Sequence, residues 1–278
     1  MRILLVLAAA ALGLFALMLG ALGLFQRSLI YPGAFTAGPR ARLPVPPGTQ
    51  ALSLLTADDE RLHALWRAPR PGCGVVVSFH GNGSRPEPAA ARFSAPPWST
   101  AGWGVLAISY RGYPGSTGAP SEDGLIADGL AAVAEAVRRA PGAPILLHGH
   151  SLGAAVAVAV AERVPHLGLY LEAPFDSLPG IVRLAFPYAP TFLLRDTWRS
   201  DARIARAGGP VLIVHGTEDG VVPVKLGRRL ATAAGEGARF ESVAGDHVSV
   251  LGTRDRLAET MFGDSLRAAC PTTAAATP

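Results

Sequence analysis

Residues 145–161, ILLHGHSLGAAVAVAVA, decide the fold of this 278-residue chain. The run Ile145–His148 is short and apolar, which is typical of a strand buried on both faces of a parallel sheet. The sequence GHSLG at 149–153 follows at once and indicates a tight turn. The stretch Ala154–Ala161 alternates like a strand, but alanine favours helix and a strand and turn precede it. We therefore predict a strand, a tight turn and a helix in this order.

Apolar runs alternate with helical stretches between residues 51 and 270, which predicts one α/β domain with a mainly parallel central sheet flanked by helices. An antiparallel hairpin is expected to open it, at Leu52–Leu55 and Leu62–Trp66. Further strands are expected at Gly74–Phe79, Gly104–Ser109, Leu167–Leu171, Val211–His215 and Phe240–Val243. Helices are expected at Ser121–Arg139, Val222–Ala234 and Val248–Ala269.

The N-terminal segment is apolar and uncharged from Ile3 to Phe25. A helix of that length spans roughly 30 Å, the thickness of the hydrocarbon core of a bilayer. We expect residues 1–27 to form a transmembrane anchor. A cleaved signal peptide is the alternative, although its apolar region is usually only about 7–15 residues long. Residues 28–50 are rich in proline and glycine and predict a linker, and residues 271–278 predict a frayed tail.

The composition excludes several classes of protein. The formal net charge is +4 and the basic residues are scattered, so nothing indicates a nucleic-acid partner. Apolar residues make up 49% of the chain, too many for a disordered protein. The spacing of the two cysteines, Cys73 and Cys270, matches no zinc motif.

The GHSLG turn carries the strongest chemical signal. Glycines on both flanks allow a strained serine conformation, and side chains two residues away on either side would collide. The turn lifts the hydroxyl of Ser151 above the sheet, at the N-terminus of the following helix. Ser151 is therefore a candidate nucleophile, whereas the simpler interpretation is a serine that caps a helix between two turn glycines.

A serine hydroxyl needs a base, and the order expected in this arrangement is serine, acid, histidine. Asp219 follows the strand Val211–His215 and is the candidate acid, although an aspartate before glycine is also a common turn residue. His247 is the only histidine after Asp219 and is the candidate base. The alternative acids are Glu218, Glu172 and Asp176.

An oxyanion formed on the substrate requires two backbone N–H donors. We expect one from Leu152, the residue after the nucleophile. The other is expected from the loop HGNG at 80–83, through Asn82, although this loop also has the form of an ordinary Asn-Gly turn. No metal or organic cofactor is needed for this chemistry.

The motifs together resemble the Bem46-like group of α/β-hydrolases, which is related to the membrane-anchored ABHD13- and ABHD17-like serine hydrolases. The matching pieces cover nearly the whole chain in order: the apolar N-terminus, LIYPG at 29–33, SFHGNG, ISYRGYPGSTGAPSEDG, GHSLG, EAPFDSL, VLIVHGTEDGVVP and the late His247. The resemblance implies an α/β-hydrolase fold with Ser151, Asp219 and His247 as the triad, and it implies the two oxyanion donors already named.

Two features of this chain qualify the resemblance. The family often has Gly-His-Asn around the histidine, whereas this chain has DHV at 246–248. About forty residues separate the strands Leu167–Leu171 and Val211–His215, too few for a large separate cap domain. We expect instead a short helical segment over the site, including Leu184–Leu194.

The implied function is a serine hydrolase that cleaves an ester or thioester acyl bond through an acyl-enzyme intermediate. The substrate would be a small-molecule or lipid-like acyl compound, and the protein would sit in a membrane through one N-terminal helix. Because the fold hosts many activities, a peptidase and a catalytically silent, membrane-tethered interaction protein stay open as alternatives.

The cysteines leave two interpretations open. Cys73 precedes the expected strand Gly74–Phe79, and Cys270 follows the last helix, which packs against the centre of the sheet in this fold. The two therefore come within reach of a disulfide. Otherwise one is a buried free thiol and the other belongs to the frayed tail. A disulfide would indicate an oxidising compartment and a catalytic domain on the exported side of the membrane.

Overall fold

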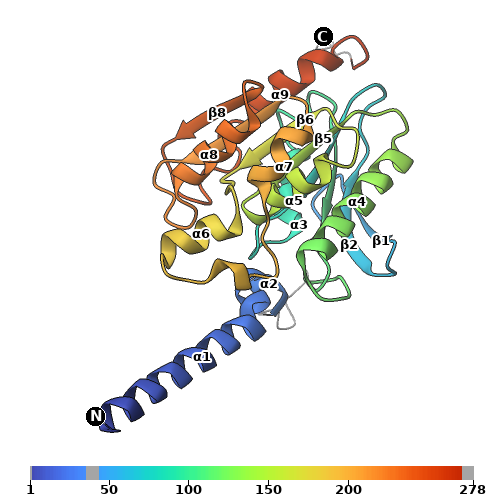
Figure 1. Cartoon of the computed structure of the whole chain (residues 1–278). Coiled ribbons are helices and arrows are strands. Elements are labelled where there is room, and N and C mark those ends of the chain that lie inside the picture. Colours follow the sequence, from blue (N-terminus) through green and yellow to red (C-terminus); the bar gives the residue numbers. More distant parts are fainter. Residues whose placement is uncertain (1, 36–43, 271–278) are drawn as a thin grey trace.

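An eight-stranded sheet forms the centre of the molecule in a computed structural model that describes residues 2–35 and 44–270 (Figure 1). The strand order is β1-β2-β4-β3-β5-β6-β7-β8. The strands are β1 Gln50–Leu55, β2 Arg61–Arg67, β3 Val75–Phe79, β4 Gly104–Ile108, β5 Ile145–His150, β6 Gly168–Glu172, β7 Val211–Gly216 and β8 Ala238–Val243.

The sheet is mainly parallel, as predicted. β1 pairs with β2, and β2 with β4, in antiparallel directions. All other neighbours are parallel, and Val77 of β3 lies between Leu106 of β4 and Leu147 of β5. Every residue of β3 to β7 is buried, because helices cover both faces of the sheet. The predicted α/β-hydrolase architecture, with its opening hairpin, is confirmed.

The helices form two layers. On one face α4, α5 and α8 contribute to the larger apolar core, and on the other face α3 and α9 contribute to a second core. The helices are α1 Arg2–Ile30, α2 Pro32–Phe35, α3 Pro86–Phe93, α4 Glu122–Arg139, α5 Leu152–Ala161, α6 Leu178–Ala185, α7 Ser200–Ala207, α8 Val224–Ala234 and α9 Asp255–Gly263, with short 3₁₀ turns η1 Thr191–Leu193 and η2 Asp264–Leu266.

The alanine-rich stretch is a helix, as predicted, and all ten residues of α5 are buried. Small side chains let this helix approach the sheet closely. A Cβ on Gly149 would lie 2.2 Å from the carbonyl oxygen of Gly153, and one on Gly153 would lie 2.0 Å from that of Phe79. Any side chain at either glycine would therefore collide with the backbone, which confirms the predicted need for glycine on both sides of Ser151.

The last helix is shorter than expected. Instead of a helix over Val248–Ala269, turns precede α9, which begins at Asp255. The side chain of Asp246 accepts hydrogen bonds from the N–H groups of Val248 and Ser249, at 2.9 and 2.8 Å. Such local side-chain bonds compete with helix formation. Gly252 then adopts φ +78°, which interrupts the helical backbone.

The N-terminal helix α1 is long and apolar enough to cross a membrane, with mean hydropathy 2.7 in its most apolar window. It projects away from the domain, on the side opposite α9 (Figure 1). It continues to Ile30, past the expected end of the anchor at residue 27. Tyr31 is fully buried and α2 follows, so the first residues of the expected 28–50 linker are part of the folded domain.

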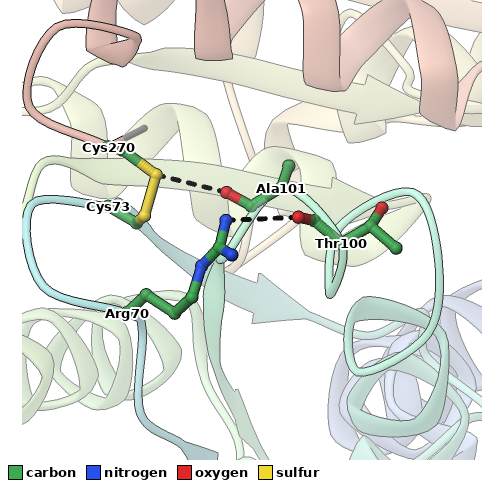
Figure 2. Close-up of a disulfide and its surroundings, with 5 residues drawn as sticks. All are labelled: Arg70, Cys73, Thr100, Ala101 and Cys270. Carbon is green, nitrogen blue, oxygen red and sulfur yellow. Dashed lines mark hydrogen bonds between the residues drawn. A yellow bond between two sulfur atoms is a disulfide. The ribbon is translucent and has the colours of Figure 1, made fainter. Parts of the chain in front are cut away.

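A disulfide joins Cys73, before β3, to Cys270, after η2, with 4.6 Å between the Cα atoms (Figure 2). Of the two interpretations of the cysteines, the structure has the bridged one. The two segments approach closely, since a Cβ on Gly72 would lie 1.7 Å from the carbonyl oxygen of Ala269. The Sγ of Cys270 lies 3.2 Å from the carbonyl oxygen of Ala101. That is a non-bonded contact, because a disulfide sulfur has no proton to donate. The expected frayed tail, 271–278, lies outside the described residues.

Candidate active site

The predicted site residues all follow strands of the parallel part of the sheet. Asn82 follows β3, Ser151 and Leu152 follow β5, Asp219 follows β7 and His247 follows β8. Because parallel strands share one direction, their C-terminal ends lie along the same edge of the sheet. We call this the carboxyl edge and the opposite one, with the disulfide, the amino edge.

Ser151 occupies the tight turn between β5 and α5 with φ 54° and ψ −117°. This backbone conformation is strained for a residue with a side chain and persists only where the surroundings enforce it. The N–H of Ser151 donates to the carbonyl oxygen of Glu172 on β6 at 2.9 Å, which ties the turn to the sheet. The side chain makes no hydrogen bond within the described residues, so the hydroxyl is uncommitted.

Asp219 and His247 form a hydrogen-bonded pair. His247 Nδ1 lies 2.7 Å from Asp219 Oδ2, and the side chain of Asp219 is fully buried. The other oxygen, Oδ1, accepts hydrogen bonds from the N–H groups of Val221 and Val222, at 2.9 and 2.7 Å. The carboxylate is therefore held on both sides, which orients the imidazole ring and leaves its Nε2 available.

The pKa of Asp219 lies well below its ordinary value. Burial alone would raise it, but hydrogen bonds with His215 and His247, together with the N–H of Val222, outweigh burial. His215 contributes through Nε2, 3.3 Å from Asp219 Oδ2. The acid is thus ionised throughout the neutral range, as a residue that orients an imidazole must be.

The three alternative acids are placed differently. Glu218 is exposed. Asp176 lies near Arg229 and accepts a hydrogen bond from the N–H of Ser177. Glu172 is fully buried and bonded to Arg92. Asp219 is the one of the four candidates that is hydrogen-bonded to His247.

Ser151 and His247 are not joined by a hydrogen bond in the described part of the chain. Their connection is indirect: His150, next to Ser151, lies with its Nε2 2.8 Å from the carbonyl oxygen of His247. Hydrogen bonds between catalytic groups are often long without substrate and tighten in the complex. The arrangement is compatible with proton transfer from Ser151 once a substrate is bound.

Of the two expected oxyanion donors, Leu152 lies in this turn, and the loop that carries Asn82 approaches the turn, since a Cβ on Gly81 would lie 2.9 Å from Nδ1 of His150. Leu152 begins α5, so its N–H has no partner within the helix. The loop of Asn82 is braced by its carbonyl oxygen, which accepts from Gly33 N at 3.1 Å and Tyr113 Oη at 2.9 Å. Its side-chain amide donates to the carbonyl oxygen of Ile30 at 3.3 Å. The segment after α1 therefore holds the loop in place.

The sequence analysis assigned no role to His150, which connects the serine turn to the histidine loop. Its ring lies 4.9 Å from that of His247, centroid to centroid. Burial lowers the pKa of His150 to about 4, so it is neutral near pH 7 and its Nε2–H donates to the carbonyl of His247. The only sequence signal was its position inside GHSLG, since the contact joins residues 97 positions apart.

A second chain of serine, histidine and acid crosses the sheet itself. Ser78 Oγ lies 2.9 Å from His148 Nδ1, and His148 Nε2 lies 2.8 Å from Glu172 Oε2. The connectivity is that of a triad. These residues are at most 2% exposed, however, and Arg92 holds Glu172 at 2.6 Å. A substrate carbonyl has no access to Ser78 and no helix begins beside it, so we interpret this chain as a structural network.

The segment expected over the site is helical only at its two ends. Within Leu184–Leu194, α6 ends at Ala185 and η1 spans Thr191–Leu193, and Pro187 and Pro190 interrupt the helix between them. Its hydrogen bonds lead to α1, not to Ser151: the side chain of Gln26 bonds to the backbone of Leu193 and Arg195. Among the described residues no cluster of three or more His, Cys, Asp or Glu could hold a metal ion.

Comparisons with known proteins agree with this architecture. A family model described as serine aminopeptidase, S33, matches residues 70–193. The chain is 37% identical over 230 residues to the uncharacterized protein Rv2307c of Mycobacterium tuberculosis, covering 79% of each chain. It is 33% identical over 238 residues to protein bem46 of Schizosaccharomyces pombe, covering 77% of this chain and 76% of that one.

More distant relatives and solved structures extend the comparison. The lysophosphatidylserine lipase ABHD12 of Danio rerio is 31% identical over 172 residues, which is 55% of this chain and 44% of that protein. The esterase Pf2001 of Pyrococcus furiosus has the same fold, with a TM-score of 0.64 at 17% identity over 84% of this chain and 97% of that one. The chain therefore belongs to the α/β-hydrolase superfamily, and within it to the same family of serine hydrolases as protein bem46.

Proposed function

We propose that this serine hydrolase cleaves ester or thioester acyl bonds with Ser151 as nucleophile, His247 as base and Asp219 as the acid that orients it. The observation that carries the proposal is the strained backbone of Ser151, φ 54°, at the edge where Asp219 and His247 form a hydrogen-bonded pair. Backbone strain of this kind costs about 1–3 kcal/mol and is concentrated at functional sites, where it positions a reactive group.

The reaction would follow two balanced steps. Ser151 Oγ attacks the acyl carbonyl carbon while His247 Nε2 takes its proton, and the N–H groups of Leu152 and Asn82 stabilise the oxyanion. The intermediate collapses, the alcohol or thiol leaves with the proton from His247, and the acyl group stays on Ser151. Water then attacks the acyl-enzyme with the same base, releasing the acid and restoring the hydroxyl.

For the substrate we propose a lipid-like acyl compound. ABHD12, a more distant relative, is named a lysophosphatidylserine lipase. The catalytic loops of this chain expose apolar side chains, since Val221 is 65% and Val248 is 64% exposed. Each lies within two residues of Asp219 or His247. An apolar rim of this kind suits an acyl chain better than a polar peptide.

A peptidase is the second candidate, because the matching family model carries the description of a serine aminopeptidase. The two are separated by comparing an acyl p-nitrophenyl ester with an aminoacyl p-nitroanilide. Cleavage of the anilide alone would replace the ester proposal.

We also propose that α1 stays attached as a membrane anchor and that the catalytic domain lies on the exported side. Two observations support this. The last residues of α1 bond to the domain, since Arg27 pairs with Asp196 at 3.1 Å and Gln26 is buried. The disulfide of Cys73 and Cys270 is typical of oxidising compartments. A membrane fraction washed with alkaline carbonate should retain the protein with an intact N-terminus, and release of a shortened chain would identify a signal peptide.

Fluorophosphonate labelling of the purified protein tests the nucleophile. Ser151→Ala should abolish labelling and ester hydrolysis. The matched control is Ser78→Ala, which removes the serine of the buried network and should leave labelling in place. Loss of labelling in Ser78→Ala alone would move the nucleophile to the network, and a wild type without labelling or hydrolysis would favour the silent interaction protein.

A further inference from the structure

The loop between α6 and α7 exposes an unusual run of large apolar side chains. Phe186 is 67%, Tyr188 100%, Phe192 85% and Leu193 44% exposed. We call residues 186–193 the aromatic segment. Single exposed apolar residues are common, but several within one short segment mark a surface that contacts a partner.

The position of this segment relative to α1 is fixed by hydrogen bonds. Gln26 Nε2 donates to the carbonyl oxygen of Leu193 at 3.3 Å, and Gln26 Oε1 accepts from the N–H of Arg195 at 2.8 Å. Arg27 adds a two-pronged contact with Asp196, at 3.1 and 3.2 Å. The aromatic segment therefore lies beside the last apolar turn of α1.

This position corresponds to the surface of a bilayer. The apolar part of α1 from Ile3 to Phe25 is long enough to span the hydrocarbon core, about 30 Å. Its C-terminal end, where Phe25 is 64% and Leu29 is 65% exposed, then reaches the boundary between hydrocarbon and headgroups. A segment bonded to Gln26 is held at the same depth.

The chemistry of the segment fits that boundary. Tyrosine and other aromatic side chains collect where a membrane meets water, because an apolar ring enters the lipid while a polar group stays hydrated. Arg183 and Arg195 are exposed on either side of the segment, within reach of phosphate headgroups. A protein partner would not explain why the aromatic segment lies directly beside the apolar helix α1.

We propose that the aromatic segment inserts at the boundary between the headgroups and the hydrocarbon of a phospholipid bilayer, beside α1. Insertion would hold the carboxyl edge, with its catalytic loops, against the membrane from which a lipid-like substrate comes. The inference rests on the proposed membrane anchoring by α1, and it adds a second contact with the lipid that does not depend on catalysis.

The test measures membrane contact directly in the full-length protein. Tyr188→Trp is reconstituted into phosphatidylcholine and phosphatidylglycerol vesicles, with or without bromine on the acyl chains, because brominated lipids quench a tryptophan that touches them. The four native tryptophans are at most 4% exposed and supply a constant background measured in the wild type.

The matched control is Val137→Trp on α4. Val137 is 48% exposed and close to the C-terminal end of α4, near the amino edge and away from α1. The proposal expects the added emission of Tyr188→Trp to be largely quenched by the brominated lipid and that of Val137→Trp to be unaffected. Phe192→Trp, in the same segment, should behave like Tyr188→Trp and covers the case in which one variant folds poorly.

Equal quenching of Val137→Trp and Tyr188→Trp would overturn the proposal. So would the absence of quenching in both Tyr188→Trp and Phe192→Trp. Emission at 188 that responds to protein concentration and not to bromine would assign the segment to a contact between copies. Fluorophosphonate labelling of the same vesicles reports on Ser151 separately, so a failed labelling with normal quenching would sink the proposed function and leave the membrane contact standing.

Discussion

The carboxyl and amino edges of the central sheet are held together by different kinds of bond. At the carboxyl edge, Ser151 is held in a strained conformation with an uncommitted hydroxyl, and the connections around it are hydrogen bonds. At the amino edge, a covalent bond between Cys73 and Cys270 joins segments 197 residues apart. The first edge holds the proposed triad, and the second holds a covalent bond that restrains the chain.

The comparison shows where the fold maintains a strained backbone conformation. A local distortion at Ser151 persists only because the rest of the domain over-determines it, and the packed cores on both faces provide that constraint. The disulfide restricts the unfolded chain and lies away from the loops of the proposed triad. Changes at the carboxyl edge should therefore alter rate, and changes at the amino edge should alter stability.

The largest effect is expected from Asp219→Asn at the carboxyl edge. The amide keeps the shape but favours the wrong tautomer of His247, and the corresponding change in a serine protease lowers kcat about 10⁴-fold. Ester turnover should fall by that order while the melting temperature changes little. Glu218→Gln, at the exposed neighbour, is the matched control, and a larger loss in that variant would make Glu218 the acid.

The next effect is expected at the amino edge. Replacing both cysteines, Cys73→Ser with Cys270→Ser, should lower the free energy of unfolding by about 2–4 kcal/mol, with about 5 kcal/mol as the upper figure for a loop this long. Urea unfolding measures the loss, and kcat of the folded variant should stay at the wild-type value. A variant as stable as the wild type, or one with a large loss of kcat, would contradict the expectation that changes at the amino edge alter stability and not rate.

Acid should destabilise the carboxyl edge first. Burial lowers the pKa of His80 and His150 from 6.5 to about 4. Between these values the unfolded chain binds protons that the folded chain does not, so stability should fall as pH falls from about 6.5 to 4, by up to about 3 kcal/mol for each group. Stability measured against pH should show this slope.

A variant assigns that slope to its residue. His150→Gln keeps a donor for the carbonyl oxygen of His247 but cannot titrate, so the slope should become shallower. His166→Gln, whose parent ring bonds to Ala207 away from the carboxyl edge, is the control. An unchanged slope in His150→Gln would mean that other groups dominate the acid response.

The smallest effect is expected where the segment after α1 contacts the loop of Asn82. A Cβ on Gly33 would lie 2.4 Å from the ring of Tyr113 and 2.6 Å from the carbonyl oxygen of Asn82. Gly33→Ala should displace the oxyanion loop and lower kcat about tenfold, which is about 1.4 kcal/mol of barrier. Gly83→Ala adds the same methyl group on the other side of Asn82, into open space, and should have little effect. Equal losses in both variants would show that the contact between Gly33 and this loop has no specific effect on kcat.

Much of the architecture was predictable because local patterns determine it. The apolar runs of the parallel strands and the fully buried helix α5 follow from residue type and spacing. The helix expected over Val248–Ala269 was too long, because the turn at Asp246 and the backbone of Gly252 depend on particular local bonds that apolar periodicity does not reveal.

The sequence alone determined the order of strand, turn and helix around Ser151, and glycine at 149 is required by a contact within the turn, whereas glycine at 153 is required by the backbone of Phe79 on a neighbouring strand. It also supplied Asp219 and His247 as candidates from their place after strands. Only the tertiary structure decided which carboxylate bonds to His247, that His150 links two loops, and that Ser78, His148 and Glu172 form a buried network. It likewise decided that the end of α1 is part of the domain. The physical reason is that a pattern in sequence reports on neighbours along the chain, whereas these contacts join segments that meet only when the sheet and its two layers have formed.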